Sequence, residues 1–247
     1  MSGHSHWSTI QRQKGVTDAK RGQTFTKIAS LITIAAKVGG GGDPDTNPRL
    51  RVILDTARSA NMPKENIQRA IDRGLGKLPG QVIEEVSYEG FGPGKVGFIL
   101  EGITDNKLRT LQEIRNAFDR SGGSLAGNGA VSYMFDKKGE LIVNNKGGSK
   151  DDEMLELIDL GADDVEDVED NKYLVYTESA DLYNMGNKIT QAGFSLESQE
   201  IIMKPNITEA ISDKVLAERI MELYDKLEEN GDIAKVYMNA DFAEGLV

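Results

Sequence analysis

The chain has 247 residues, no cysteine and two histidines, so its composition excludes disulfides, thiolate metal sites and cysteine nucleophiles. No stretch approaches the ~20 apolar residues of a membrane span, and no signal peptide is recognisable, so we expect a cytoplasmic protein with no membrane partner. The net charge of −11 is uneven: residues 1–80 hold 13 Lys and Arg against 6 Asp and Glu (+7), and residues 81–247 hold 16 against 34 (−18). This asymmetry favours nucleic acid as the partner of the basic part, with a basic protein as a partner option for the acidic part.

The basic part opens with residues 3–27, which contain the only tryptophan and both histidines. Cationic side chains around an indole ring can hold phosphates while a base stacks on the ring. The competing interpretation is a solvated, frayed terminus. The residues that we assign to nucleic-acid binding in this segment are His4, Trp7, Arg12, Lys14, Lys20, Arg21 and Lys27.

Three helices are predicted in the basic part. Apolar residues at three- and four-residue steps predict the first over residues 17–37. Gly39–Gly42 end it, as a hinge or a helix C-cap; a phosphate cradle is the less favoured interpretation, because no Lys-Ser/Thr follows to make a P-loop. Asn47-Pro48 is typical of a helix start, and Asn61-Met62-Pro63 separates a third helix that ends at Gly74. We expect a helical pair between Glu65 and Arg69. The further residues assigned to nucleic-acid binding, with solubility as their alternative role, are Arg49, Arg51, Arg58, Arg69 and Arg73.

After residue 80 the period changes to the alternation of strands. Strands are predicted over 82–88 and 96–100, with a turn at 90–94 and alternating burial in the second strand. A helix follows from Asp105 or Asn106. Its expected inner positions are Leu108, Leu111, Ile114 and Phe118. The glycine-rich loop 122–129 is either a hinge or a tip that approaches an RNA backbone, since glycine permits both.

In residues 133–203 the predicted strands and helices follow one another in the order of a known folding unit. Strands at 133–144, 163–169, 172–178 and 196–203, with helices at 151–160 and 180–192, follow the βαββαβ order of ferredoxin-like folds. A helix over 212–229, with Val215 on its apolar face, and a strand over 233–238 come last. Because a lone strand must join a sheet, we expect it to pair with the strands before residue 121. The prediction is an α+β fold with a helical domain (1–80), a discontinuous α/β domain (81–132 plus 205–247) and an inserted ferredoxin-like domain (133–204).

The chain carries no recognisable catalytic constellation. His4 and His6 fall short of a zinc ligand set. The acidic clusters 151–153 and 163–170 are interpreted as the first turn of a helix and a solvated strand face. We therefore expect no metal, no cofactor and no enzymatic activity.

Several segments together resemble the YebC family. They are GHSHW at 3–7, DAKRGQTFTK at 18–27, GGGGDPDTNPRLR at 39–51, NMPKENIQRAI at 61–71, YEGFGPG at 88–94 and GGSLAGNGAVSYMF at 122–135. The resemblance implies a helical domain, two α/β domains of which one is discontinuous, and a role in gene expression.

Two roles are described within that family: a translation factor on the ribosome, and a DNA-binding transcriptional regulator. We favour RNA and the ribosome, because no helix-turn-helix with a dimer interface is recognisable and an acidic part suits a partner rich in basic proteins. Alternatives of another class are an enzyme that uses the α/β cleft and a protein adaptor.

Overall fold

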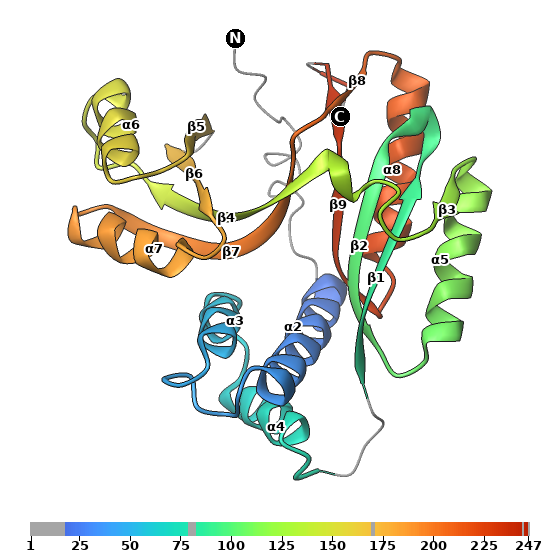
Figure 1. Ribbon diagram of the computed structural model, residues 1–247, viewed down its shortest axis with the longest axis horizontal. Coiled ribbons are helices and arrows are strands. Elements are labelled where there is room, and N and C mark those ends of the chain that lie inside the picture. Colours follow the sequence, from blue (N-terminus) through green and yellow to red (C-terminus); the bar gives the residue numbers. More distant parts are fainter. Residues whose placement is uncertain (1–17, 79–82, 169–170, 244, 247) are drawn as a thin grey trace. The chain divides into compact units, whose positions relative to one another are not determined.

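The computed structural model describes residues 18–78, 83–168, 171–243 and 245–246 (Figure 1). Its fold is α+β, with N-terminal helices followed by two sheets, which confirms the predicted fold class. The described residues form two compact units, one made of residues 136–204 and the other of the chain on either side. The three domains and their boundaries stay a prediction.

The helical part contains α2 (Asp18–Val38), α3 (Pro48–Ser59) and α4 (Lys64–Gly74). Helix α2 packs against both of the others, and the three share one apolar core. The buried residues of this core are Ile28, Ile32, Ala35, Ala36, Leu50, Leu54, Ala57, Met62, Ala70 and Ile71. The apolar residues at three- and four-residue steps therefore predicted the packed face of α2 correctly.

Asn47 is the predicted cap of α3, and the structure confirms it. Its Oδ1 accepts the Leu50 N–H at 3.0 Å. The side chain is fully buried, and its Nδ2 also donates to the carbonyl oxygens of Ala35 at 2.9 Å and Gly41 at 2.8 Å. One amide thus satisfies backbone groups at the end of α2, in the glycine loop and at the start of α3.

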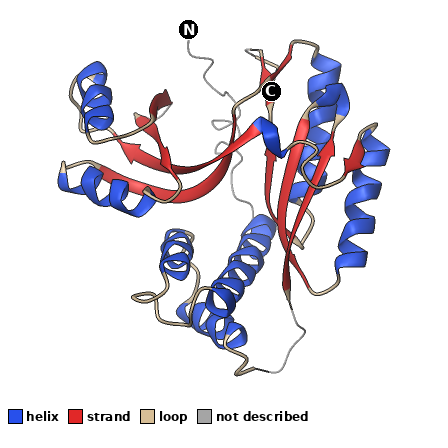
Figure 2. Ribbon diagram, in the orientation of Figure 1, coloured by secondary structure: helices blue, strands red, loops and turns tan. Residues whose placement is uncertain are grey.

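The first sheet has the order β3-β1-β2-β9 (Figure 1), with β1 at Glu84–Phe91, β2 at Gly97–Thr104, β3 at Ser124–Ala126 and β9 at Ile233–Met238. Figure 2 shows its strands in red. Strand β9 lies antiparallel to β2, with Met238 opposite Phe98, so the C-terminal strand pairs as predicted. Helices α5 (Lys107–Ser121) and α8 (Lys214–Glu228) pack against each other and this sheet. The short parallel pair β8 (Glu209–Ile211) and β10 (Ala240–Phe242) was not predicted.

Three details of burial were predicted wrongly. Leu108 and Val215 are exposed by 79% and 63% instead of facing inward. Each stands two positions before a buried residue, Thr110 or Ala217. Two positions correspond to a rotation of about 200° around a helix with 3.6 residues per turn, so Leu108 and Val215 lie on the opposite side of the helix from these buried residues. Strand β2 does not alternate, because as an inner strand it is buried on both faces except at Glu101.

The unit 136–204 is built from β4 (Phe135–Asn144), α6 (Lys150–Asp159), β5 (Asp164–Val168), β6 (Lys172–Glu178), α7 (Leu182–Gln191) and β7 (Ser195–Pro205). Its sheet order, β5-β6-β4-β7, is that of a ferredoxin-like βαββαβ unit. Both helices contribute to one core on this sheet, with Leu157 from α6 and Met185 from α7 among its members.

Candidate nucleic-acid interface

Six of the seven N-terminal residues assigned to nucleic acid fall in two groups. His4, Trp7, Arg12 and Lys14 lie outside the described residues. Lys20 and Arg21 belong to the first turn of α2. Their roles in binding stay predictions.

Lys27 is in contact with the neighbouring α/β part of its unit. Its Nζ donates to the carbonyl oxygen of Glu228 at 2.5 Å, at the last residue of α8. Burial lowers the pKa of Lys27, against the opposing effect of the Glu228 carboxylate. Arg49 also forms an ion pair, with Glu85 of β1. Lys27 thus joins the helical part to the end of α8, and Arg49 joins it to β1, so a phosphate would have to displace an existing partner.

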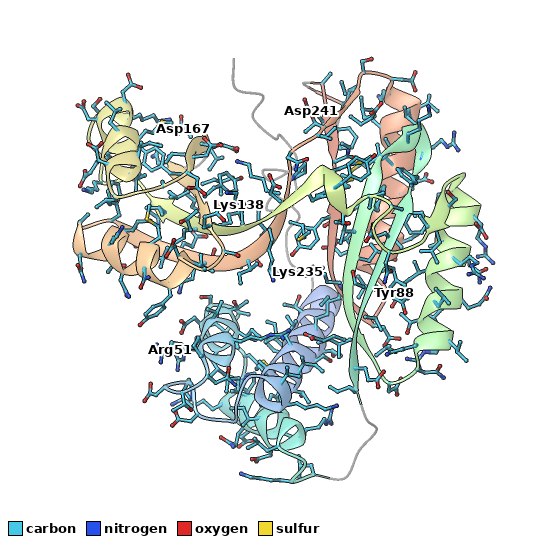
Figure 3. All side chains as sticks on the ribbon, viewed as in Figure 1. Arg51, Tyr88, Lys138, Asp167, Lys235 and Asp241 are labelled. Atoms are coloured by element: carbon cyan, nitrogen blue, oxygen red, sulfur yellow. The ribbon has the colours of Figure 1, made fainter. Side chains whose placement is uncertain are left out.

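Arg51 and Arg58 bind groups within the helical part. Arg51, labelled in Figure 3, donates from Nε to Pro44 O at 2.9 Å and from Nη2 to Asp45 O at 3.1 Å, and so fixes the loop before α3. Arg58 pairs with Asp55 at 2.8 Å, with 69% of its side chain exposed. An exposed ion pair contributes only ~0–1 kcal/mol, so Arg58 can exchange its carboxylate for a phosphate at little cost.

Arg69 and Arg73 lie one turn apart on α4, and both are exposed. Among the residues that the structure describes, neither has an ion-pair partner, and the expected pair between Glu65 and Arg69 does not form. Both line an open hollow of about 260 Å³ on the helical part. The other lining residues are Phe25, Thr26, Ala29, Ser30, Met62, Asn66 and Ala70.

Glu89 holds the glycine-rich loop, a role that its strand position did not reveal. Only 7% of Glu89 is exposed, and its carboxylate accepts N–H groups from Gly129 and Val131, both at 2.7 Å, and from Ser132 at 3.1 Å. Burial alone would raise the pKa of Glu89, but the backbone hydrogen bonds outweigh it and hold the pKa below the usual value. The loop is thus fastened to β1 by one charge.

The acidic clusters are less solvated than the sequence indicated. Glu153 is 5% exposed and accepts the N–H of Lys146 at 3.0 Å, that of Gly148 at 2.8 Å and the Tyr173 hydroxyl at 3.1 Å. Burial, followed by this hydrogen bond, raises the pKa of Tyr173 to about 12. Glu166 is 6% exposed and pairs with Lys204 at 3.3 Å. The expectation of a solvated strand face is therefore wrong for Glu166, whereas residues 151–153 form the acidic first turn of α6, as predicted.

Two negative observations apply to the described part of the chain. It contains no group of three or more His, Asp or Glu side chains arranged to hold a metal ion; His4 and His6 lie outside it. None of its helices has the length and apolar character needed to cross a bilayer.

Both parts of this arrangement, the N-terminal helices and the two sheets, match models of one protein family. Residues 5–77 match the family model described as "TACO1/YebC protein N-terminal domain", and residues 83–240 match "TACO1/YebC second and third domain". The chain belongs to the TACO1/YebC family.

Curated relatives align over nearly the whole chain. Proteins of Citrifermentans bemidjiense (46% identity, 99% of this chain and 97% of the relative) and Chlorobaculum tepidum (45%, 100% and 98%) are both named probable transcriptional regulatory proteins. A crystal structure of a conserved hypothetical protein from Aquifex aeolicus is 38% identical, with a TM-score of 0.89 over 98% of this chain and 99% of that one.

Proposed function

We propose that the protein is a non-enzymatic regulator of gene expression that binds nucleic acid through its basic helical part, with ribosomal RNA as the ligand. The observation that carries the proposal is the concentration of positive charge in residues 1–80, at +7 in a chain of net −11. Arg69 and Arg73 add two exposed guanidinium groups without a carboxylate partner in the described residues. The regulatory names of the relatives support a role in gene expression.

RNA on the ribosome is favoured because the rest of the chain carries −18. That part would be repelled by a bare duplex, whereas ribosomal proteins offer it basic surfaces. A second candidate, DNA binding in transcription, is favoured by the printed names of the relatives. The same basic surface would serve either ligand, since phosphate contacts carry no sequence information.

The test compares two fourfold variants with equal charge change. The first neutralises Lys20, Arg21, Arg69 and Arg73 to Gln; the control neutralises the exposed residues Arg115, Lys137, Lys214 and Lys226 to Gln. Lys27 is left unchanged, because replacing it would also remove its hydrogen bond to the carbonyl oxygen of Glu228 and so would change the packing as well as the binding. Short RNA and DNA are titrated at several salt concentrations. With four to six phosphate contacts, log K should fall with log salt at a slope of roughly −3 to −4 on single strands.

We expect the first variant to bind weakly with a slope flattened by about 2 to 3, and the control to behave like the wild type. Sedimentation from lysate with and without RNase then separates ribosomes from DNA as the physiological ligand. Equal affinity and slope in both variants would place binding elsewhere. If the wild-type chain binds neither RNA nor DNA, a protein adaptor or an enzyme becomes the better hypothesis for its function.

A further inference from the structure

The hollow on the helical part has an apolar floor. Phe25 packs partly buried against the bundle core, and Met62 is 6% exposed. Ala29 and Ala70 add small side chains, which leave a volume of about 260 Å³ open. Typical small-molecule pockets enclose ~300–1,000 Å³, so this hollow is suited to a flat group of modest size.

The rim of the hollow supplies the opposite chemistry. Arg69 and Arg73 have no ion-pair partner among the described residues, and Asn66 makes no side-chain hydrogen bond there. Guanidinium groups bind phosphate and stack on bases, and a carboxamide offers both donors and an acceptor to a base edge. These groups are available for a ligand because no other residue that the structure describes engages them.

We infer that this hollow is a pocket for one nucleotide of single-stranded nucleic acid: the base lies over Phe25 and Met62, Asn66 bonds to the base edge, and Arg69 and Arg73 hold the adjoining phosphate. This inference rests on the proposed function and adds a defined site to it. An acidic peptide would satisfy the arginines but has no flat ring for the apolar floor. A base paired within a duplex is stacked on its neighbours and has to be unstacked first, so single strands bind better than duplexes.

The experiment uses the full chain with Trp7→Ala, which removes the other predicted stacking residue. The probe is a short single-stranded RNA with one 2-aminopurine, and a second RNA has an abasic position there. Stacking in the pocket quenches the 2-aminopurine fluorescence. Loss of the base should weaken binding about tenfold, without altering the salt dependence, because no phosphate contact is lost.

Three variants test the parts of the pocket. Phe25→Leu keeps an apolar floor but removes the ring, and should abolish the quenching; Asn66→Ala should weaken binding of the base-containing RNA and leave that of the abasic RNA unchanged. Arg69→Gln with Arg73→Gln should flatten the salt slope by about 0.7, because one phosphate contact is lost. The matched control, Lys64→Gln, removes a charge from the same helix at an exposed position outside the hollow, and should retain the quenching and the preference for the base-containing RNA.

The outcomes separate the pocket from the proposed function. The pocket is overturned if Phe25→Leu quenches the 2-aminopurine fluorescence as strongly as the Trp7→Ala chain with Phe25 intact, or if the abasic and base-containing RNAs bind with equal affinity. The fourfold variant of the proposed-function test still decides where the general binding surface lies. Displacement of the RNA from the pocket by an oligoglutamate peptide at lower concentration than by a nucleotide also overturns it. Circular dichroism monitors folding, and if Phe25→Leu unfolds, Asn66→Ala and the arginine pair decide.

Discussion

Single carboxylates organise two loops of this protein. Glu89 binds the N–H groups of Gly129, Val131 and Ser132, and Glu153 binds those of Lys146 and Gly148. A loop has no neighbouring strand or helical turn to accept its backbone N–H groups, and a buried N–H group needs an acceptor. The two carboxylates supply these acceptors. The sequence gives no sign of this role for a glutamate in a strand or in the first turn of a helix, because the carboxylate and its N–H donors meet only in the folded chain.

At this scale, Glu89→Gln should reduce stability by ~1–3 kcal/mol at pH 7, since the amide leaves a buried N–H group without an acceptor. The folded pKa of Glu89 lies below its usual value of 4.5, so the charge stabilises the fold above about pH 4.5 and that stabilisation disappears as the pH falls through the folded pKa. Urea unfolding at several pH values should show the difference shrinking in acid. Glu65→Gln, at an exposed carboxylate of α4, is the control. A difference that stays constant down to pH 3 would contradict the assignment.

A second residue-level prediction compares two helix caps. Asn47 and Asn106 each accept a helical N–H, from Leu50 and Arg109, but only Asn47 is fully buried and donates to two further carbonyl groups. Asn106→Ala should cost ~1 kcal/mol. Asn47→Ala should cost about 2–4 kcal/mol, because a buried network is lost with the cap. Thermal unfolding measures both, and equal losses would show that the additional hydrogen bonds contribute nothing.

At the scale of elements, the close approach of α2 and α4 depends on one glycine. A Cβ at Gly74 would lie 2.3 Å from Thr33 O and 2.8 Å from the Ala36 Cβ. Thr33 Oγ1 also donates to Ala70 O at 3.1 Å, so the two helices are joined where there is no room for a side chain. This contact positions Phe25 and Ala29 beside Arg69 and Arg73 around the hollow.

Gly74→Ala should therefore push α4 away from α2. Overpacking costs ~1–3 kcal/mol, and the better helix propensity of alanine returns at most ~1 kcal/mol, so the net effect is destabilising. Circular dichroism melting should show a lower midpoint. Gly231→Ala, where no atom lies within 4 Å of the added Cβ, should change little. A stabilised Gly74→Ala variant would mean that the helices separate without cost.

At the scale of the whole molecule, the chain leaves and re-enters the larger unit at neighbouring points. The N–H of Asn206 donates to Met134 O at 2.9 Å. Residues 136–204 form a compact unit with a core of its own. This arrangement supports the proposal that the ferredoxin-like part is an inserted domain, because a short linker can join its two ends.

Replacing residues 137–203 by a short glycine-serine linker should leave the remaining chain folded. The removed segment holds 6 Lys against 16 Asp and Glu, so its loss also removes ten negative charges and should raise nucleic-acid affinity several-fold at low salt, with a smaller gain at high salt. Circular dichroism and the same RNA titrations measure both effects. Unfolding of the remainder would show that the insertion is needed for the other unit.

The order of the main helices and strands, the cap at Asn47 and the separation of positive and negative charge follow from the amino-acid sequence, which left Asp105 and Asn106 as alternative caps of α5; the structure shows Asn106. These properties depend on residues near one another in the chain, through periodicity, turn chemistry and composition. The sequence also predicted that residues 233–238 join the sheet of residues 82–121, since a lone strand needs a sheet; that β2 is the partner is seen only in the structure.

The folded structure was needed to show which apolar residues stay exposed, as Leu108 and Val215 do, and which charged residues are buried, as Glu89 and Glu166 are. It also decided that Lys27 contacts Glu228 while Arg69 and Arg73 line an open hollow. The physical reason is that burial and pairing depend on segments far apart in the chain. A local pattern fixes which face of a helix is apolar on average, but not which neighbour covers each position.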